Sequence, residues 1–240
     1  MNTLPESIYK VYTEKDPEFQ RQEVPEVGTE VEYRGGYKFA FCTTQYQLSA
    51  ASVVSCPSPF RAKMGIPEVD LYGNWTEFTI KADKYFKVNR LKHGCIILCR
   101  DGKEPKSYTI MENKSTNADG HTSLRLSSPL LHPLEREIKN EIYVFYPPRR
   151  GIEIGGREWA IGIAVTSTTA NIDNYFWVQT RGPAAVRAAS PELSKITHKP
   201  ISLTTSGIFL NPAKQGDRIV GFSTGVPINN IMPAYIDFGG

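Results

Sequence analysis

The run 175–184, which reads YFWVQTRGPA, carries the strongest structural signal in the chain. In a β-strand, side chains alternate between the two faces of the sheet. The odd-numbered residues from Tyr175 to Gln179 would therefore share one face, and Phe176 and Val178 would lie on the other. Because both faces carry large apolar side chains, the run predicts a strand that is buried from both sides.

The polar end of the run sets two further expectations. Gln179 interrupts the aromatic face, so its amide would need a hydrogen-bond partner or water if it is buried. Gly182-Pro183 is expected to end the strand, because proline has no N–H group to give to the ladder. The alternative is a ligand-stacking platform, since exposed aromatic rings beside Gln179 and Arg181 would suit a carbohydrate.

The candidate structural and interface residues come from this run and from the other two tryptophans of the chain. They are Tyr175, Trp177, Gln179, Arg181, Trp75 and Trp159. The buried-strand interpretation places Trp177 in a core. The platform interpretation requires Trp177 or Trp75 to be exposed to solvent, where its fluorescence would respond to a polysaccharide.

Segments of strand type flank the run at the spacing of about 8–12 residues that is typical of a sandwich or barrel. Residues 29–44 read as a hairpin around Gly35-Gly36, and residues 94–113 read as another around Asp101-Gly102. No segment keeps a 3.6-residue period over more than two turns. The sequence therefore predicts an all-β fold, built of antiparallel β-sandwich or barrel modules.

Local pattern divides the chain into three parts. Residues 1–28 are polar and punctuated by proline, so we expect an extended N-terminal arm that is ordered only where it finds a surface. It would be a disordered tail or reach a neighbouring subunit. Residues 29–150 form the expected β-rich domain. Residues 151–240 form a second sandwich or barrel module, which could pack with the first as one unit.

Composition argues against two classes of partner. The formal net charge is only +3 and the basic residues are scattered, whereas a nucleic-acid-binding protein concentrates them on one face. No uninterrupted apolar run approaches the roughly 18 residues that span a bilayer, and the N-terminus lacks the pattern of a secretory signal. We therefore expect neither a nucleic-acid partner nor a membrane partner.

The sequence contains no catalytic or metal-binding motif that we recognise. A GxSxG elbow, a P-loop, an HExxH pair and a dinucleotide-binding glycine pattern are all missing from it. Cys95 and Cys99 would lie about 13 Å apart on one face of a strand, too far for a disulfide or a shared metal. Glu135 and Glu137 lack the apolar surroundings that raise a carboxyl pKa. We expect free thiols in a reducing compartment, no enzyme and no cofactor.

The order of these segments resembles that of the β-rich head decoration (cement) and structural proteins of tailed bacteriophages. The specific parts are the aromatic-VQTxGPA run and the hairpin that contains Tyr108 and Ile110. The similarity extends from about Val27 to the C-terminus. Phe176 stands where the family pattern has glycine, and residues 103–105 replace a glycine-rich turn.

The resemblance implies a non-enzymatic virion protein on the capsid exterior, assembled in the host cytoplasm, that binds the major capsid protein and stabilises the shell. It also implies a homo-oligomer, a dimer or a trimer, whose arm bridges capsomers. The open alternatives are a tail, adaptor or head-fibre component, and a β module that binds host glycans.

Overall fold

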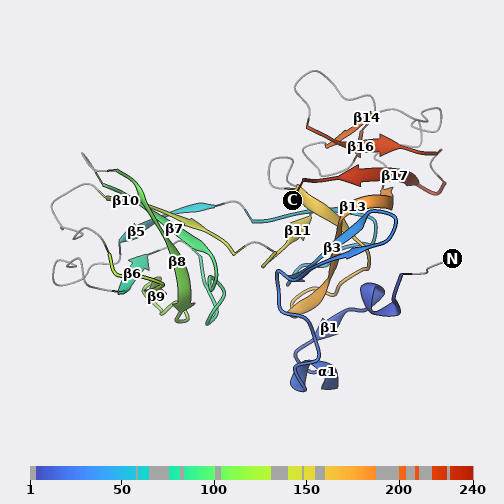
Figure 1. Cartoon of the computed structure of the whole chain (residues 1–240). Coiled ribbons are helices and arrows are strands. Elements are labelled where there is room, and N and C mark those ends of the chain that lie inside the picture. The colour runs from blue at the N-terminus through green and yellow to red at the C-terminus, as the bar shows by residue number, and fades with distance from the viewer. Residues whose placement is uncertain are drawn as a thin grey trace. The chain divides into compact units, whose positions relative to one another are not determined.

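The computed structural model describes residues 4–57, 59–64, 76–81, 84–100, 104–130, 140–147, 149–154, 160–187, 200–203, 209–210, 218–225 and 228–239. These residues form two compact units of antiparallel strands (Figure 1). Helix in the described ranges is limited to the 3-10 turn η1 (Glu6–Tyr9) and the short α1 (Pro17–Gln20). The predicted all-β fold is confirmed. No helix in these ranges is long and apolar enough to cross a membrane.

The two units do not follow the division expected from the sequence. Unit 1 comprises Met1–Pro57 together with Arg149–Gly240, and unit 2, Ser58–Pro148, is inserted between these two parts. Strand pairing joins the parts of unit 1, as in the register between Val53 and Ile163. Such pairing links positions that are far apart in the chain, so local sequence patterns do not reveal it.

Unit 1 is a curled sheet of eleven described strands in the order β11-β4-β12-β13-β17-β16-β14-β15, with β1 and β3 also paired to β13 and β2 paired to β3. Their bounds are β1 Tyr12–Thr13, β2 Glu30–Tyr33, β3 Tyr37–Thr44, β4 Val53–Ser55, β11 Glu153–Ile154, β12 Ala160–Ala164, β13 Asn174–Arg187, β14 Pro200–Leu203, β15 Phe209–Leu210, β16 Ile219–Ser223 and β17 Ile231–Asp237. The predicted hairpin in residues 29–44 is β2–β3, and its turn glycines Gly35 and Gly36 both adopt positive φ.

The first half of β13 is buried on both faces, as its alternation predicts. Phe176 and Val178 are fully buried in a cluster with side chains of β3, β4 and β12. Trp177 lies on the opposite face, where its side chain is only 4% exposed. Its indole packs edge-to-face on Phe41, with ring centroids 5.0 Å apart. The stacking-platform interpretation is therefore wrong for Trp177.

The second half of β13 corrects the prediction that Gly182-Pro183 ends the strand. β13 continues without a break to Arg187. A bulge between Gln179 and Arg181 shifts the register against β3, and from Arg181 onward β13 pairs with β17.

Pro183 fits within β13 because of the direction in which its backbone points. The N–H of Phe238 donates to the carbonyl of Thr180, so even-numbered β13 residues exchange hydrogen bonds with β17. The odd-numbered Arg187 donates its N–H away from β17, to the carbonyl of Ala51. Pro183 shares that parity, so its missing N–H costs no bond in the β13–β17 ladder.

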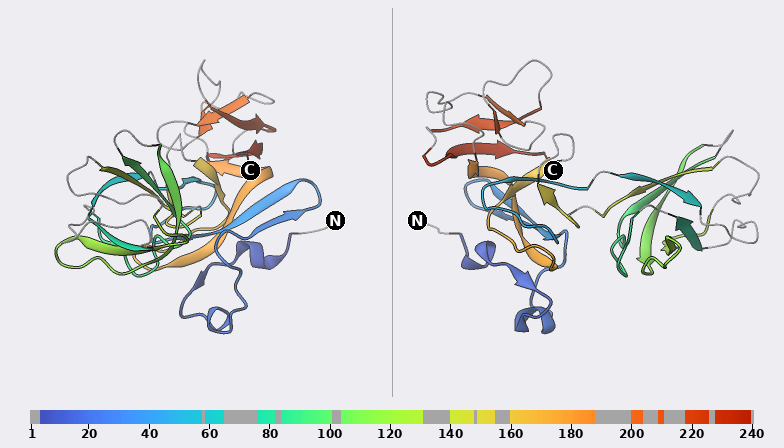
Figure 2. Two further views of the ribbon diagram at one scale, coloured as in Figure 1. Left: turned by 60° about the vertical axis from the view of Figure 1, so that its left-hand side comes forward. Right: turned by 180° about the vertical axis from the view of Figure 1, so that it is seen from behind.

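The N-terminal segment finds its surface on unit 1 itself (Figure 2). Ile8 of η1 is fully buried beside Phe41 and Trp177. β1 pairs with the start of β13 through Tyr12 and Tyr175. Residues 4–27 therefore cover the aromatic face of β3 and β13. This packing differs from both expectations for the segment, which were a disordered tail and an arm that reaches a neighbouring subunit.

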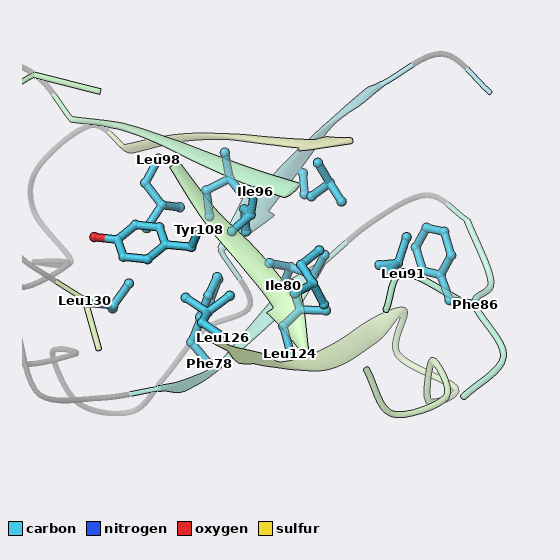
Figure 3. Packing of buried hydrophobic residues seen from close by; sticks show 14 residues of the cluster. Phe78, Ile80, Phe86, Leu91, Ile96, Leu98, Tyr108, Leu124, Leu126 and Leu130 are labelled. Carbon is cyan, nitrogen blue, oxygen red and sulfur yellow. The ribbon is translucent and has the colours of Figure 1, made fainter. Parts of the chain in front are cut away.

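Unit 2 is a closed barrel in the order β10-β5-β6-β9-β8-β7. Its strands are β5 Phe60–Met64, β6 Glu77–Lys81, β7 Cys95–Arg100, β8 Lys106–Asn113, β9 His121–Leu126 and β10 Asn140–Phe145. The predicted second hairpin is β7–β8, with Ile96 opposite Tyr108, although its turn residues 101–103 lie outside the described residues. Buried aliphatic and aromatic side chains fill the barrel (Figure 3).

All four cysteines are free thiols. Cys42 is fully buried in β3, and this burial raises the pKa of its thiol. The described strand β7 carries both Cys95 and Cys99, as expected.

Replacing Trp177 with alanine is expected to lower the free energy of unfolding of unit 1 by about 3–5 kcal/mol, because a cavity would replace the buried indole. Tyr46→Ala removes a ring that is 52% exposed in the same unit, and it should change the stability by no more than about 0.5 kcal/mol. Differential scanning calorimetry of both variants measures the difference. An unchanged melting temperature for Trp177→Ala would contradict the burial of this ring.

Candidate functional site

A groove of about 680 Å³ in unit 1 is the candidate site. Its walls come from the N-terminal segment, β3, the turn before β4, β12, β13 and the region around β17. The lining is largely apolar, as with Leu4, Phe39 and Ile163, and none of the described lining residues is charged. The main polar side chains are Gln179, Thr224 and the two tyrosines Tyr9 and Tyr37.

Gln179 holds the bulge beside the groove. Its amide nitrogen donates to the carbonyl of Pro183 at 2.7 Å and to that of Arg181 at 3.2 Å. The residue is buried, so these bonds satisfy the expectation that its amide needs a partner. Both carbonyls lie at the bulge, on the side of β13 that faces away from β17. The Gln179 side chain provides a hydrogen-bond donor for each of them.

Gly182 brings the β2–β3 turn against β13. Its φ is +101°, and a Cβ at this position would lie 2.9 Å from the Gly36 carbonyl oxygen and 3.0 Å from the Tyr37 Cα. Both the left-handed backbone and the close approach require glycine. The Gly-Pro pair therefore marks a tight contact within a continuing strand.

Arg181 lies at the bulge and faces β17. Its Nε atom is 3.5 Å from a carboxylate oxygen of Asp237, its cross-strand neighbour. The Nε–H group makes no hydrogen bond in this arrangement, and both side chains are partly exposed. Such a surface ion pair contributes little to stability, and the Arg181 side chain stays partly exposed at the surface of the sheet.

Tyr175 is held by the N-terminal segment. Its ring lies 4.6 Å from that of Phe19, and its hydroxyl donates to a carboxylate oxygen of Glu14 at 3.2 Å. Burial raises the pKa of the Tyr175 phenol far above its usual value, and the negative charge of Glu14 adds to the shift. Tyr175 therefore stays a neutral hydrogen-bond donor and helps to fix the segment that borders the groove.

The sequence candidates do not gather into one site. Tyr175 and Trp177 pack beneath the N-terminal segment, whereas Gln179 lines the groove and Arg181 lies at the sheet surface. Trp75 and Trp159 lie outside the described residues.

A row of apolar side chains, not expected from the sequence, crosses four strands next to the groove. Register places Pro183 opposite Tyr235, Tyr235 opposite Phe222, and Phe222 opposite Pro200. Directly paired residues lie on the same face of a sheet. Pro183 and Phe222 are exposed, and Pro183 also lines the groove, so the row and the groove adjoin. We refer to these four residues as the cross-strand row.

The described part of the chain holds no group of three or more His, Cys, Asp or Glu side chains that could bind a metal ion. Comparison with known proteins adds no assignment, because no protein-family model, no curated protein and no solved structure matches the chain. The groove and the cross-strand row are therefore defined by geometry alone.

Replacing Gln179 with methionine keeps the side-chain length but removes the amide donor of two carbonyls. The free energy of unfolding of unit 1 should fall by about 1–3 kcal/mol, the usual cost of leaving buried polar groups without partners. Gln47→Met alters an exposed glutamine of the same unit and is the matched control. Equal denaturation midpoints for the two variants would show that the amide does not hold the bulge.

Proposed function

We propose that the chain is a non-enzymatic virion structural protein of a tailed bacteriophage, which decorates the capsid exterior by binding the major capsid protein. The observation that supports this proposal is the place of the YFWVQTRGPA run in the fold. These residues carry the resemblance to head decoration proteins, they make up most of β13, and their end from Gln179 to Ala184 borders the groove.

The proposed occupant of the groove is an extended apolar segment of the capsid protein. The walls of the groove offer apolar contacts without any charged side chain among the described lining residues. Ala185 is exposed, and the parity of the β13–β17 ladder directs its N–H and C=O away from β17. These groups have no partner among the described residues, so they can pair with the backbone of an incoming strand.

The cross-strand row is the proposed contact between copies of the chain in a dimer or trimer. A partly exposed apolar row of this kind suits a self-complementary interface between identical subunits. Many copies on a symmetric shell make each weak contact effective, because neighbouring contacts raise the local concentration. Decoration therefore requires a rigid scaffold with apolar contact surfaces and no chemical step.

Mass spectrometry of purified virus particles tests the assignment to the head. Decoration predicts an abundance close to that of the major capsid protein. A few copies per particle would contradict decoration and favour a tail, adaptor or head-fibre component. Absence of the chain from particles would contradict every virion assignment.

The groove itself is tested with Ile228→Asp, since this lining side chain is 74% exposed and can be changed without opening the core. A carboxylate in an apolar contact should weaken binding to undecorated shells at least about tenfold, or roughly 1.4 kcal/mol. Ile172→Asp makes the same change at an exposed isoleucine of unit 1 outside the groove. Co-sedimentation in which both variants bind equally would contradict the role of the groove.

A further inference from the structure

Unit 2 carries a polar pocket of about 350 Å³ on its barrel, unlike the apolar groove of unit 1. The lining residues are Thr79 of β6, His121 and Ser123 of β9, and Lys114, Ser115 and Asn117 of the loop after β8. None of them belongs to the site described above. All six side chains offer polar groups, and none is a carboxylate.

The pocket is already formed by strand pairing. Thr79 lies opposite Ser123 in the β6–β9 ladder, and their hydroxyl oxygens are 3.4 Å apart. The loop after β8 is fixed to β9, because the N–H of Lys114 donates to the carbonyl of Ser123 and that of Asn117 donates to the carbonyl of His121. A ligand would therefore meet groups that are held in place before it binds.

Asn113 anchors the start of this loop. The residue is buried, and its side-chain oxygen accepts the N–H of Leu91 at 2.7 Å. Its amide nitrogen donates to the carbonyls of Lys87 and Lys114, each at 2.9 Å. These three hydrogen bonds hold the backbone at the start of the loop that carries Lys114 and Ser115.

Two side chains of the lining, His121 and Lys114, each have a polar group without the hydrogen-bond or ion-pair partner that such a group normally has. The Nε2 atom of His121 is shielded from solvent and makes no hydrogen bond, which is uncommon for a buried ring nitrogen. The ammonium group of Lys114 makes no ion pair with the described residues, although Glu77 and Glu112 lie beside an adjoining hollow. Glu112 is paired with Arg125 at 2.9 Å.

The lining offers more hydrogen-bond donors than acceptors. The side-chain oxygen of Asn117 already accepts the N–H groups of Asp119 and His121, which leaves its NH₂ group as the unused part. Lysine is a donor only, and each hydroxyl can donate one hydrogen. A ligand that matches this set is rich in acceptors and negatively charged.

We infer that the pocket binds an oxyanion, as a free ion such as phosphate or as the carboxylate of an acidic sugar. Lys114 supplies the charge, and the Ser115 hydroxyl, one hydroxyl of the Thr79–Ser123 pair and the Asn117 amide supply directed donors. The inference does not rest on the proposed capsid role, since it concerns residues of unit 2 alone.

The test is a ¹H–¹⁵N NMR titration of the whole chain with inorganic phosphate, N-acetylneuraminic acid and glucose in separate arms. Saturable shifts of Lys114, Asn117 and His121 with either anion at millimolar concentration are expected, and the tighter anion identifies the source. Lys114→Met should weaken that binding about tenfold, roughly 1.4 kcal/mol. Lys92→Met, a change in the same unit outside the pocket, should leave it unchanged.

Three results would overturn the inference. These are no saturable shift with either anion, equal binding of glucose and the anions, and equal weakening by Lys114→Met and Lys92→Met. Lys114 is exposed, so its replacement should leave the barrel folded, which circular dichroism verifies. No viral shell enters this experiment, so its outcome is independent of the decoration assays.

Discussion

The burial of β13 from both sides is the constraint on which unit 1 depends. Trp177 packs against Phe41 and the N-terminal Ile8 on one face, while Phe176 and Val178 pack into a second cluster on the other. The backbone of the same strand pairs with β1, β3, β12 and β17. One strand thus contributes to three hydrophobic clusters and four pairings, and it joins the two parts of the chain that make up unit 1.

Because of the bulge in β13, the part of the strand that follows Gln179 borders the groove at the surface of unit 1. At the bulge the strand passes from pairing with β3 to pairing with β17, and backbone groups are left on its other side. Gln179 covers two of these carbonyls, and Gly182 lets the β2–β3 turn approach. What remains open beside them is an apolar groove with the backbone of Ala185 at its edge. A site of this kind suits an extended partner segment, which is the contact that the proposed decoration role would use.

Features that arise from neighbouring residues could be predicted, whereas those that depend on distant pairing could not. The alternation in YFWVQTRGPA gave the two-sided burial, and turn glycines located the β2–β3 hairpin. The sequence does not predict that β13 continues through Pro183. Proline fits there only because its nitrogen points away from β17, and that direction is set by pairing with a distant strand. The inserted barrel and the covering by Ile8 and Tyr12 depend on contacts between remote segments. The need of Gln179 for a hydrogen-bond partner could be predicted, but the groove that it borders and the pocket around His121 result from tertiary packing.

Hydrogen exchange of the β13 backbone, measured by NMR in the whole chain, tests the central role of this strand most directly. If unit 1 depends on β13, the amides of residues 176–179 exchange only when the unit unfolds globally. Their exchange free energy should then equal the free energy of unfolding of unit 1, and it should be the highest in that unit. Exchange of these amides through local opening, well before the rest of unit 1 exchanges, would contradict the account.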